Sequence, residues 1–410
     1  MTSYQPQSKV GWLDFNDEAA KQMAETIRAL QEPSTLDPLG FGSIRNAFAD
    51  LLAPGTSTIQ TRVRYFLFVP WICQSIENSD ITASQFNDQL RNDEAALIEC
   101  LKNVGQNQGV QGLISGIKLK RMPSSTYWGG LYSWGLRNRN WSIAEYGRNI
   151  ARLCSIANRD GGDETVGSDP TTIWTDLPSA PDKFLEADID FNLTSDEAQF
   201  IIQKIRESHP ESLLAAACEN PQLAANAEWA WEVDASLLTD ELNEILFHAR
   251  NISEVTLGAQ LVYNLLIARR VDEELKRDVD DDIAFQLHSL NEWAQIITDR
   301  QKELSDWFTG LESLWTLLSQ SANISKPAQV FTEKIIKLAL NEPFNFIEDR
   351  KVHELVIQRE KALKGPRARF VNLEGLKEWN GSGFGGQLNY RWPICKSYLT
   401  DLADALNRDN

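Results

Sequence analysis

Apolar residues recur at intervals of three and four along most of this chain, the spacing that places side chains on one face of a helix. Residues 43–53 show the pattern with Ile44, Ala47, Phe48 and Leu51. The same periodicity predicts helices at residues 16–30, 85–104, 141–158, 237–270, 283–297, 300–319, 328–341, 344–362 and 391–406. The chain is therefore predicted to be mainly α.

Two of the helix starts carry an explicit local signal. Residues 142–145 and 194–197 each have a Ser or Thr followed three residues later by Glu, which is the capping-box sequence. The alternation of a half-buried strand is scarce by comparison. Only Leu113–Lys120 and Arg367–Val371 are predicted to be short strands.

The most unusual pattern lies where charge meets dense apolar sequence. Arg62 and Arg64 directly precede the aromatic and aliphatic run of residues 65–71, which ends in Pro70-Trp71. This run fits either a buried strand or a helix. Its length and a preceding Thr-Ser cap favour a helix that is kinked or ended near Pro70, because proline lacks the backbone N–H of a helix interior.

A change in composition suggests how the chain is divided. Residues 160–190 are rich in Gly, Pro, Asp and Ser, which is typical of a linker. We therefore expect an N-terminal, mostly helical domain with a few short strands at residues 1–159. A larger α-helical domain is expected at residues 191–410.

The net charge of −18 over 410 residues is unevenly distributed. Residues 40–160 have a net charge of +4, with 13 Lys and Arg against 9 Asp and Glu, and residues 350–400 have +6, with 10 against 4. Most of the acid therefore lies between these two zones. An acidic protein usually binds nucleic acid poorly, but segregated charge weakens that objection because the basic zones can act locally.

The five cysteines are widely spaced and include no Cys-x-x-Cys pair, which fits a reducing compartment. The N-terminus has no apolar signal-peptide core. No apolar run approaches the roughly 18 residues that a membrane span needs. The sequence therefore predicts a cytoplasmic protein without membrane contact.

No catalytic signature stands in the sequence. The four histidines are far apart, and neither a Gly-x-Ser-x-Gly elbow nor a phosphate-binding P-loop is present. We therefore expect no catalytic residue, no metal and no cofactor. A metal-dependent nuclease remains an alternative, because residues 274–276 and 349–351 have the local acid–lysine spacing of such enzymes.

Nucleic-acid contact is the better chemical hypothesis. Several basic residues stand beside aromatic residues or glycine, where cations suit phosphate and exposed rings can stack on unpaired bases. The candidate contacts are Arg62, Arg64, Lys118, Lys120, Arg121, Arg137, Arg139, Lys364, Arg367 and Arg369. The same pattern also arises from Arg–Trp stacking and carboxylate pairing inside a large helical protein.

Several stretches taken together resemble a known bacterial family. They are residues 54–71, 120–128, 253–264, 363–369 and 390–392. The family has about this length and is described as a domain of unknown function. Its members are found in antiviral-defence loci, near helicases and phospholipase D-like nucleases. The resemblance implies an accessory role in defence against foreign DNA, but it implies no activity and transfers no catalytic residue.

The sequence thus leads to one main hypothesis and two alternatives. The main one is a non-catalytic accessory subunit of an antiviral defence assembly that contacts DNA or RNA and a helicase or nuclease subunit. The first alternative is a pure protein scaffold or regulator of a helicase or nuclease. The second is the metal-dependent nuclease.

Overall fold

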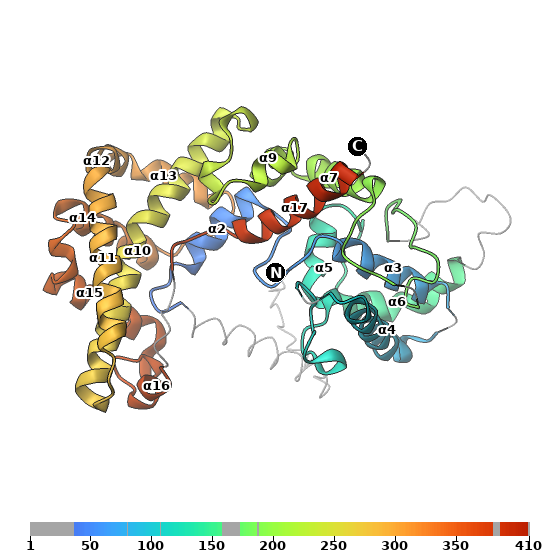
Figure 1. The fold of residues 1–410 in the computed structure, drawn as a ribbon, viewed down its shortest axis with the longest axis horizontal. Helices are drawn as coiled ribbons and strands as arrows, with labels where there is room; N and C mark the ends of the chain where they lie inside the picture. The colour runs from blue at the N-terminus through green and yellow to red at the C-terminus, as the bar shows by residue number, and fades with distance from the viewer. Residues whose placement is uncertain are drawn as a thin grey trace, which may run out of the picture. The chain divides into compact units, whose positions relative to one another are not determined.

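The computed structural model describes residues 37–79, 81–106, 108–157, 173–186, 188–379 and 386–408, except for the side chains of 154–157. These residues are mainly helical (Figure 1). Paired extended backbone in the described ranges is limited to an isolated antiparallel bridge between Arg137 and Trp174. The prediction of a mainly α protein is confirmed. The helix predicted at residues 16–30 lies outside the described residues.

The chain forms two compact units, and neither is a continuous stretch of sequence. The smaller unit comprises residues 1–42, 255–308 and 326–387, and the larger unit comprises residues 43–254, 309–325 and 388–410. Residues 160–172 of the predicted linker lie outside the described residues. The sequence-based division into 1–159, 160–190 and 191–410 stays a prediction.

The larger unit contains most of the helices from the first 250 residues, with two later additions. They are α2 (Gly42–Leu52), α3 (Tyr65–Glu77), α4 (Ala83–Asn103), α5 (Pro123–Ser133), α6 (Ile143–Ala157), α7 (Ser195–Ser208), α8 (Leu213–Ala217), α9 (Pro221–Ala225), α13 (Leu311–Ser319) and α17 (Trp392–Arg408). Helix α3 packs against α4, α5 and α6, and α17 packs against α7 and α9 (Figure 1).

The smaller unit is built from helices of the C-terminal half of the chain. They are α11 (Asp280–Asp299), α12 (Gln301–Thr309), α14 (Lys326–Asn341), α15 (Arg350–Lys364) and α16 (Leu373–Lys377). The long helix α10 (Asp240–Leu275) contributes its first part to the larger unit and its second part to the smaller one. Within the smaller unit α14 packs against both α11 and α15.

Helix α3 is the centre of the larger unit. All residues from Tyr65 to Cys73 are buried, so the apolar run is core on every side. The ring of Phe66 stacks on Trp134 with centroids 3.8 Å apart, and Tyr65 lies 5.1 Å from Tyr127. The favoured prediction of a helix is confirmed, but the helix continues through Pro70 to Glu77, so it does not end near Pro70. Burial on all sides outweighs the hydrogen bond that proline cannot make.

The two helix starts predicted from capping boxes agree with the structure, whereas the helix predicted at residues 344–362 begins only at Arg350. Thr194 Oγ1 accepts a hydrogen bond from the backbone N–H of Glu197 at 3.1 Å, and the Glu197 carboxylate accepts one from the N–H of Thr194 at 3.0 Å. Ser142 and Glu145 make the same reciprocal pair. The helix predicted at residues 300–319 is instead broken at Gly310 into α12 and α13.

The two predicted short strands are wrong. Residues 113–120 form turns and the 3-10 helix η2 (Gly116–Lys118), and residues 367–371 follow from the 3-10 helix η6 (Gly365–Arg367) into turns. Gly112, Gly116 and Gly365 have φ angles of +85°, +49° and +53°. These left-handed conformations turn the chain and are incompatible with extended backbone.

Candidate nucleic-acid interface

Arg62 is bound inside the larger unit. Its Nε donates to Asp401 of α17 at 3.0 Å and its NH2 group donates to the same carboxylate at 2.6 Å. The guanidinium also lies 4.7 Å from the ring centroid of Phe191. Burial raises the pKa of Asp401, and the bonds from Arg62 act against that rise. The pair therefore ties the start of α3 to the C-terminal helix.

Arg64 is more deeply enclosed, with 6% of its surface exposed. Its NH2 group donates to Glu197 Oε1 at 2.9 Å, and its NH1 group donates to the carbonyl of Asp190 at 3.0 Å. Glu197 is the capping-box partner of Thr194 at the start of α7. The same carboxylate therefore caps α7 and pairs with the arginine that precedes α3. The geometry gives Arg64 a structural role.

Arg137 also has internal partners. Its Nε and NH2 groups donate to the carbonyl of Trp128 at 3.2 and 3.1 Å, and its guanidinium lies 4.8 Å from the Trp128 ring centroid. Burial lowers the pKa of Arg137 to about 10. Nearby Arg139 is half-buried, with its guanidinium 5.2 Å from the ring of Trp141. The Arg–Trp adjacency seen in the sequence is thus largely stacking within the protein.

Lys118, Lys120 and Arg121 differ because all three are exposed. They lie in the loop between α4 and α5, where Lys118 is the last residue of η2 and Lys120 and Arg121 follow it. Arg91 of α4 holds this loop in place, since its NH2 group donates to the carbonyls of Ile117 at 2.6 Å and Leu119 at 2.8 Å. The three cations are therefore presented to solvent on a braced loop.

The same loop presents two apolar side chains that the sequence analysis missed. Ile114 is 98% exposed and Ile117 is 48% exposed. These two isoleucines forgo the free energy that burial of their side chains would give. The signal in the sequence was the glycine spacing around residues 109–116, which favours turns over the predicted strand.

The sequence of this loop and of the helices that follow it is poor in acid, although Glu99 of α4 lies beside Gly116. Residues 102–157, called here the basic segment, contain eight Lys and Arg and a single acidic residue, Glu145. Arg148 and Arg152 of α6 are also exposed, and α6 packs against α4. The basic segment is therefore a local exception to the net charge of −18.

The remaining candidates belong to the smaller unit. Lys364 is buried at the end of α15, Arg367 is exposed and Arg369 is half-buried. Arg369 NH1 lies 3.4 Å from the hydroxyl of Tyr263 and 4.0 Å from Glu360 Oε1. Neither Tyr263 nor Glu360 had been selected from the sequence.

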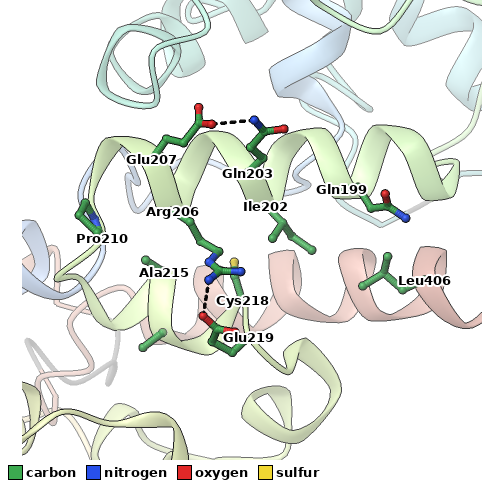
Figure 2. Close-up of a pocket in the computed structure, with 11 residues that line it drawn as sticks. Gln199, Ile202, Gln203, Arg206, Glu207, Pro210, Ala215, Cys218, Glu219 and Leu406 are labelled. Atoms are coloured by element: carbon green, nitrogen blue, oxygen red, sulfur yellow. Dashed lines mark hydrogen bonds and ion pairs between the residues drawn. The ribbon is translucent and has the colours of Figure 1, made fainter.

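An open groove of about 710 Å³ crosses another face of the larger unit (Figure 2). Ile202 and Arg206 of α7 face α8 and Leu406 of α17, and the Arg206 guanidinium meets Glu219 at 2.5 Å. Cys218 lines the groove, but burial raises the pKa of its thiol to about 12. The groove therefore offers mixed apolar and charged surface without an activated nucleophile.

Metal ligands are not gathered in the part of the chain that the structure describes. Within it, no three His, Cys, Asp or Glu side chains are placed to hold a metal ion. His209 Nε2 lies 2.8 Å from Ser133 Oγ, and His353 Nε2 lies 2.8 Å from the carbonyl of Ile347. The described residues thus supply no ligand set for the metal-dependent nuclease alternative.

The chain matches the family described as "Family of unknown function (DUF6361)" over residues 7–406. The protein belongs to this family. No curated protein and no solved structure matches the chain. Among the described residues, no helix combines the length and apolar character that crossing a bilayer requires.

Proposed function

We propose that this member of the DUF6361 family is a non-catalytic accessory subunit that contacts nucleic acid through its basic segment and docks a partner protein of an antiviral defence assembly. The observation that carries the proposal is the braced loop with Lys118, Lys120 and Arg121 exposed together. Phosphate contacts dominate nucleic-acid affinity, and a cluster of exposed cations supplies them.

The exposed isoleucines support the same proposal. Proteins that bind the minor groove insert apolar side chains between base steps while neighbouring cations hold the phosphates. Ile114 stands four residues before Lys118 on the same loop and is almost entirely exposed. The loop therefore has the chemical parts of an apolar wedge flanked by phosphate contacts.

The defence assembly is part of the proposal because the resemblance described in the sequence analysis implies an accessory role beside helicases and nucleases. Under this proposal the partner is a helicase or nuclease subunit that performs the chemistry. The basic segment would then deliver DNA or RNA to that subunit.

Fluorescence anisotropy with labelled single-stranded and duplex DNA and RNA, over about 50 to 200 mM salt, tests the proposal. We expect the variant K118Q/K120Q/R121Q to bind at least ~10-fold more weakly at the lowest salt. Its slope of log affinity against log salt should be shallower by about 2 to 3, since each lost contact to duplex phosphate changes the slope by about 0.9. Ile114→Ser should weaken binding without changing the slope.

The matched control is K302Q/K334Q/K337Q, which removes the same charge from exposed positions outside the basic segment. It should bind like the unchanged protein. Equal weakening by both triple variants would show that the affinity depends on net charge and not on the basic segment. An absence of binding at low salt would refute nucleic-acid contact.

The pure scaffold is the second candidate, and the groove along α7 and α8 favours it. Its apolar floor and paired charges suit a segment of a partner protein. Co-expression with candidate helicase or nuclease subunits, compared between the unchanged protein and Ile202→Glu, tests this function. Loss of the partner with Ile202→Glu, together with unchanged DNA binding, separates it from the basic segment.

A further inference from the structure

A pocket of about 210 Å³ lies in the smaller unit where the chain leaves α15. Its lining includes Lys364, Arg367, Arg369, Asn372, Glu374 and Glu378. At this size it is smaller than the usual site for a drug-sized molecule and matches a compact ion or a single functional group. Three cations line this small pocket, so the question is which groups balance their charge.

Lys364 is the unusual member of the set. Its side chain is 5% exposed, and its ammonium nitrogen is buried without a hydrogen-bond partner. The nearest carboxylate oxygen, Glu360 Oε1, is 3.7 Å away, which is too far for a hydrogen bond. Buried ammonium groups are normally paired and hydrogen-bonded, because losing water is costly. Lys364 therefore has donor capacity that the protein does not use.

Glu360 cannot fully compensate Lys364, because it serves other groups. Its Oε1 accepts from the hydroxyl of Tyr263 at 2.6 Å, and its Oε2 accepts from the backbone N–H of Phe370 at 3.1 Å. Arg369 also faces the same carboxylate at 4.0 Å. Burial lowers the pKa of Lys364, the charge of Arg369 adds to that effect, and Glu360 opposes it. Lys364 and Arg369 thus both face the Glu360 carboxylate, and the charge of Asp37 also opposes the lowering of the Lys364 pKa.

The rest of the lining contains one more cation and three side chains that carry acceptor oxygens. Arg367 is exposed at the mouth, and the side-chain oxygen of Asn372 accepts from the N–H of Glu374 at 3.0 Å. Glu374 is paired with Lys377 at 2.7 Å, which offsets its charge. Glu378 is the second carboxylate of the lining.

We propose that this pocket binds a phosphoryl group, held by Lys364, Arg367 and Arg369. A tetrahedral dianion provides acceptors for the buried ammonium and for guanidinium groups at once. Both free phosphate and the phosphate of a nucleoside monophosphate present this chemistry. The inference is independent of the basic segment, which lies in the larger unit.

Isothermal titration calorimetry of the full chain with inorganic phosphate and with adenosine monophosphate, each up to about 10 mM, tests the proposal. We expect saturable binding of at least one ligand and a rise of the melting temperature in its presence, because a ligand of the native state stabilises it. Tighter binding of the nucleotide would identify a nucleotide phosphate as the source, and tighter binding of inorganic phosphate would identify the free ion.

Lys364→Met and Arg367→Gln should each weaken this binding at least ~10-fold and remove the rise of the melting temperature. Lys364→Met should not lower the melting temperature of the ligand-free protein, since the ammonium it removes is under-compensated. Arg367 is exposed, so Arg367→Gln gives a folded variant even if Lys364→Met fails to fold. Lys351→Gln, an exposed position of the same helix, is the matched control and should bind normally.

Three results would overturn the proposal. The first is an absence of binding by both ligands, and the second is equal binding by the unchanged protein and by Arg367→Gln. The third is displacement of the bound phosphate by a short oligonucleotide without a terminal phosphate, which would make the pocket a contact for a continuous backbone. K118Q/K120Q/R121Q should retain phosphate binding, so failure of the nucleic-acid proposal and failure of this one are distinguishable.

Discussion

Glu94 of α4 is 2% exposed, and its Oε1 accepts a hydrogen bond from the backbone N–H of Ser124 at 2.5 Å. Burial raises the pKa of Glu94 from 4.5 to about 7, against the opposing effect of that hydrogen bond. A carboxyl whose pKa is higher in the folded state favours folding when it is protonated. Its contribution is complete below about pH 4.5 and is lost as the pH rises through about 7.

Glu94→Gln should remove this pH dependence, because the amide oxygen still accepts from Ser124 but no proton is bound. The free energy of unfolding of the unchanged protein should fall between pH 5 and pH 8 by ~3 kcal/mol more than that of the variant. Urea denaturation at both pH values measures the difference. Glu99→Gln, an exposed position of the same helix, is the control, and parallel behaviour of all three proteins would contradict the assignment.

At the residue scale, the ten candidate cations separate by their surroundings. Arg62, Arg64 and Arg137 have partners inside the larger unit, whereas Lys118, Lys120 and Arg121 face solvent. Their positions along the chain could not separate them, because each stands near an aromatic residue or glycine. The partners of Arg62 and Arg64 lie 339 and 133 residues away, a separation that local reading cannot bridge.

At the element scale, the contact between α3 and α5 depends on one glycine. A Cβ atom on Gly130 would lie 2.5 Å from the carbonyl oxygen of Gly55 and 2.8 Å from the Phe66 ring. A Cβ atom on the adjacent Gly129 would meet nothing within 4 Å. Substitution of Gly130 therefore tests packing, and substitution of the adjacent Gly129 tests helix propensity alone.

Gly130→Ala should lower the free energy of unfolding by about 1 to 3 kcal/mol, because backbone and a buried ring must move. Gly129→Ala should raise it by about 0.5 to 1 kcal/mol, since alanine is the better helix former and has room. Thermal and urea unfolding of the two variants measure these changes. Equal effects of the two substitutions would show that α5 does not pack as described.

Helices α3 and α17 show how prediction succeeds and fails for whole elements. The periodicity near residues 391–406 predicted a terminal helix, and α17 confirms it. For α3 the residue types alone left strand and helix both open, because a fully buried segment has no polar face to reveal its period. The structure shows that this segment is a helix, enclosed on all sides by its neighbours.

At the scale of the whole molecule, the larger unit needs the end of the chain. Helix α17 packs against α7 and α9, and Asp401 binds Arg62. The hydroxyl of Tyr398 lies 3.0 Å from Gln60 Oε1. These contacts close the unit around segments that are distant in sequence.

Removal of residues 388–410 should therefore abolish cooperative unfolding of the larger unit, since it leaves Arg62 unpaired and exposes the faces that α17 covers. Removal of residues 409 and 410 alone, which spares α17, is the control. Circular dichroism and calorimetric melting distinguish the two. A sharp, unchanged transition in the longer truncation would show that α17 is dispensable.

The sequence by itself determined the helical class, the positions of most helices and the capping boxes, because these depend on interactions within a few residues. It also located the basic zones that contain every candidate contact. Only the tertiary structure decided which cations are free to meet a phosphate and which are neutralised inside. Whether a cation is neutralised depends on carboxylates and carbonyls from remote segments and on the exposure of its own side chain. The spacing of residues along the chain predicts neither of these.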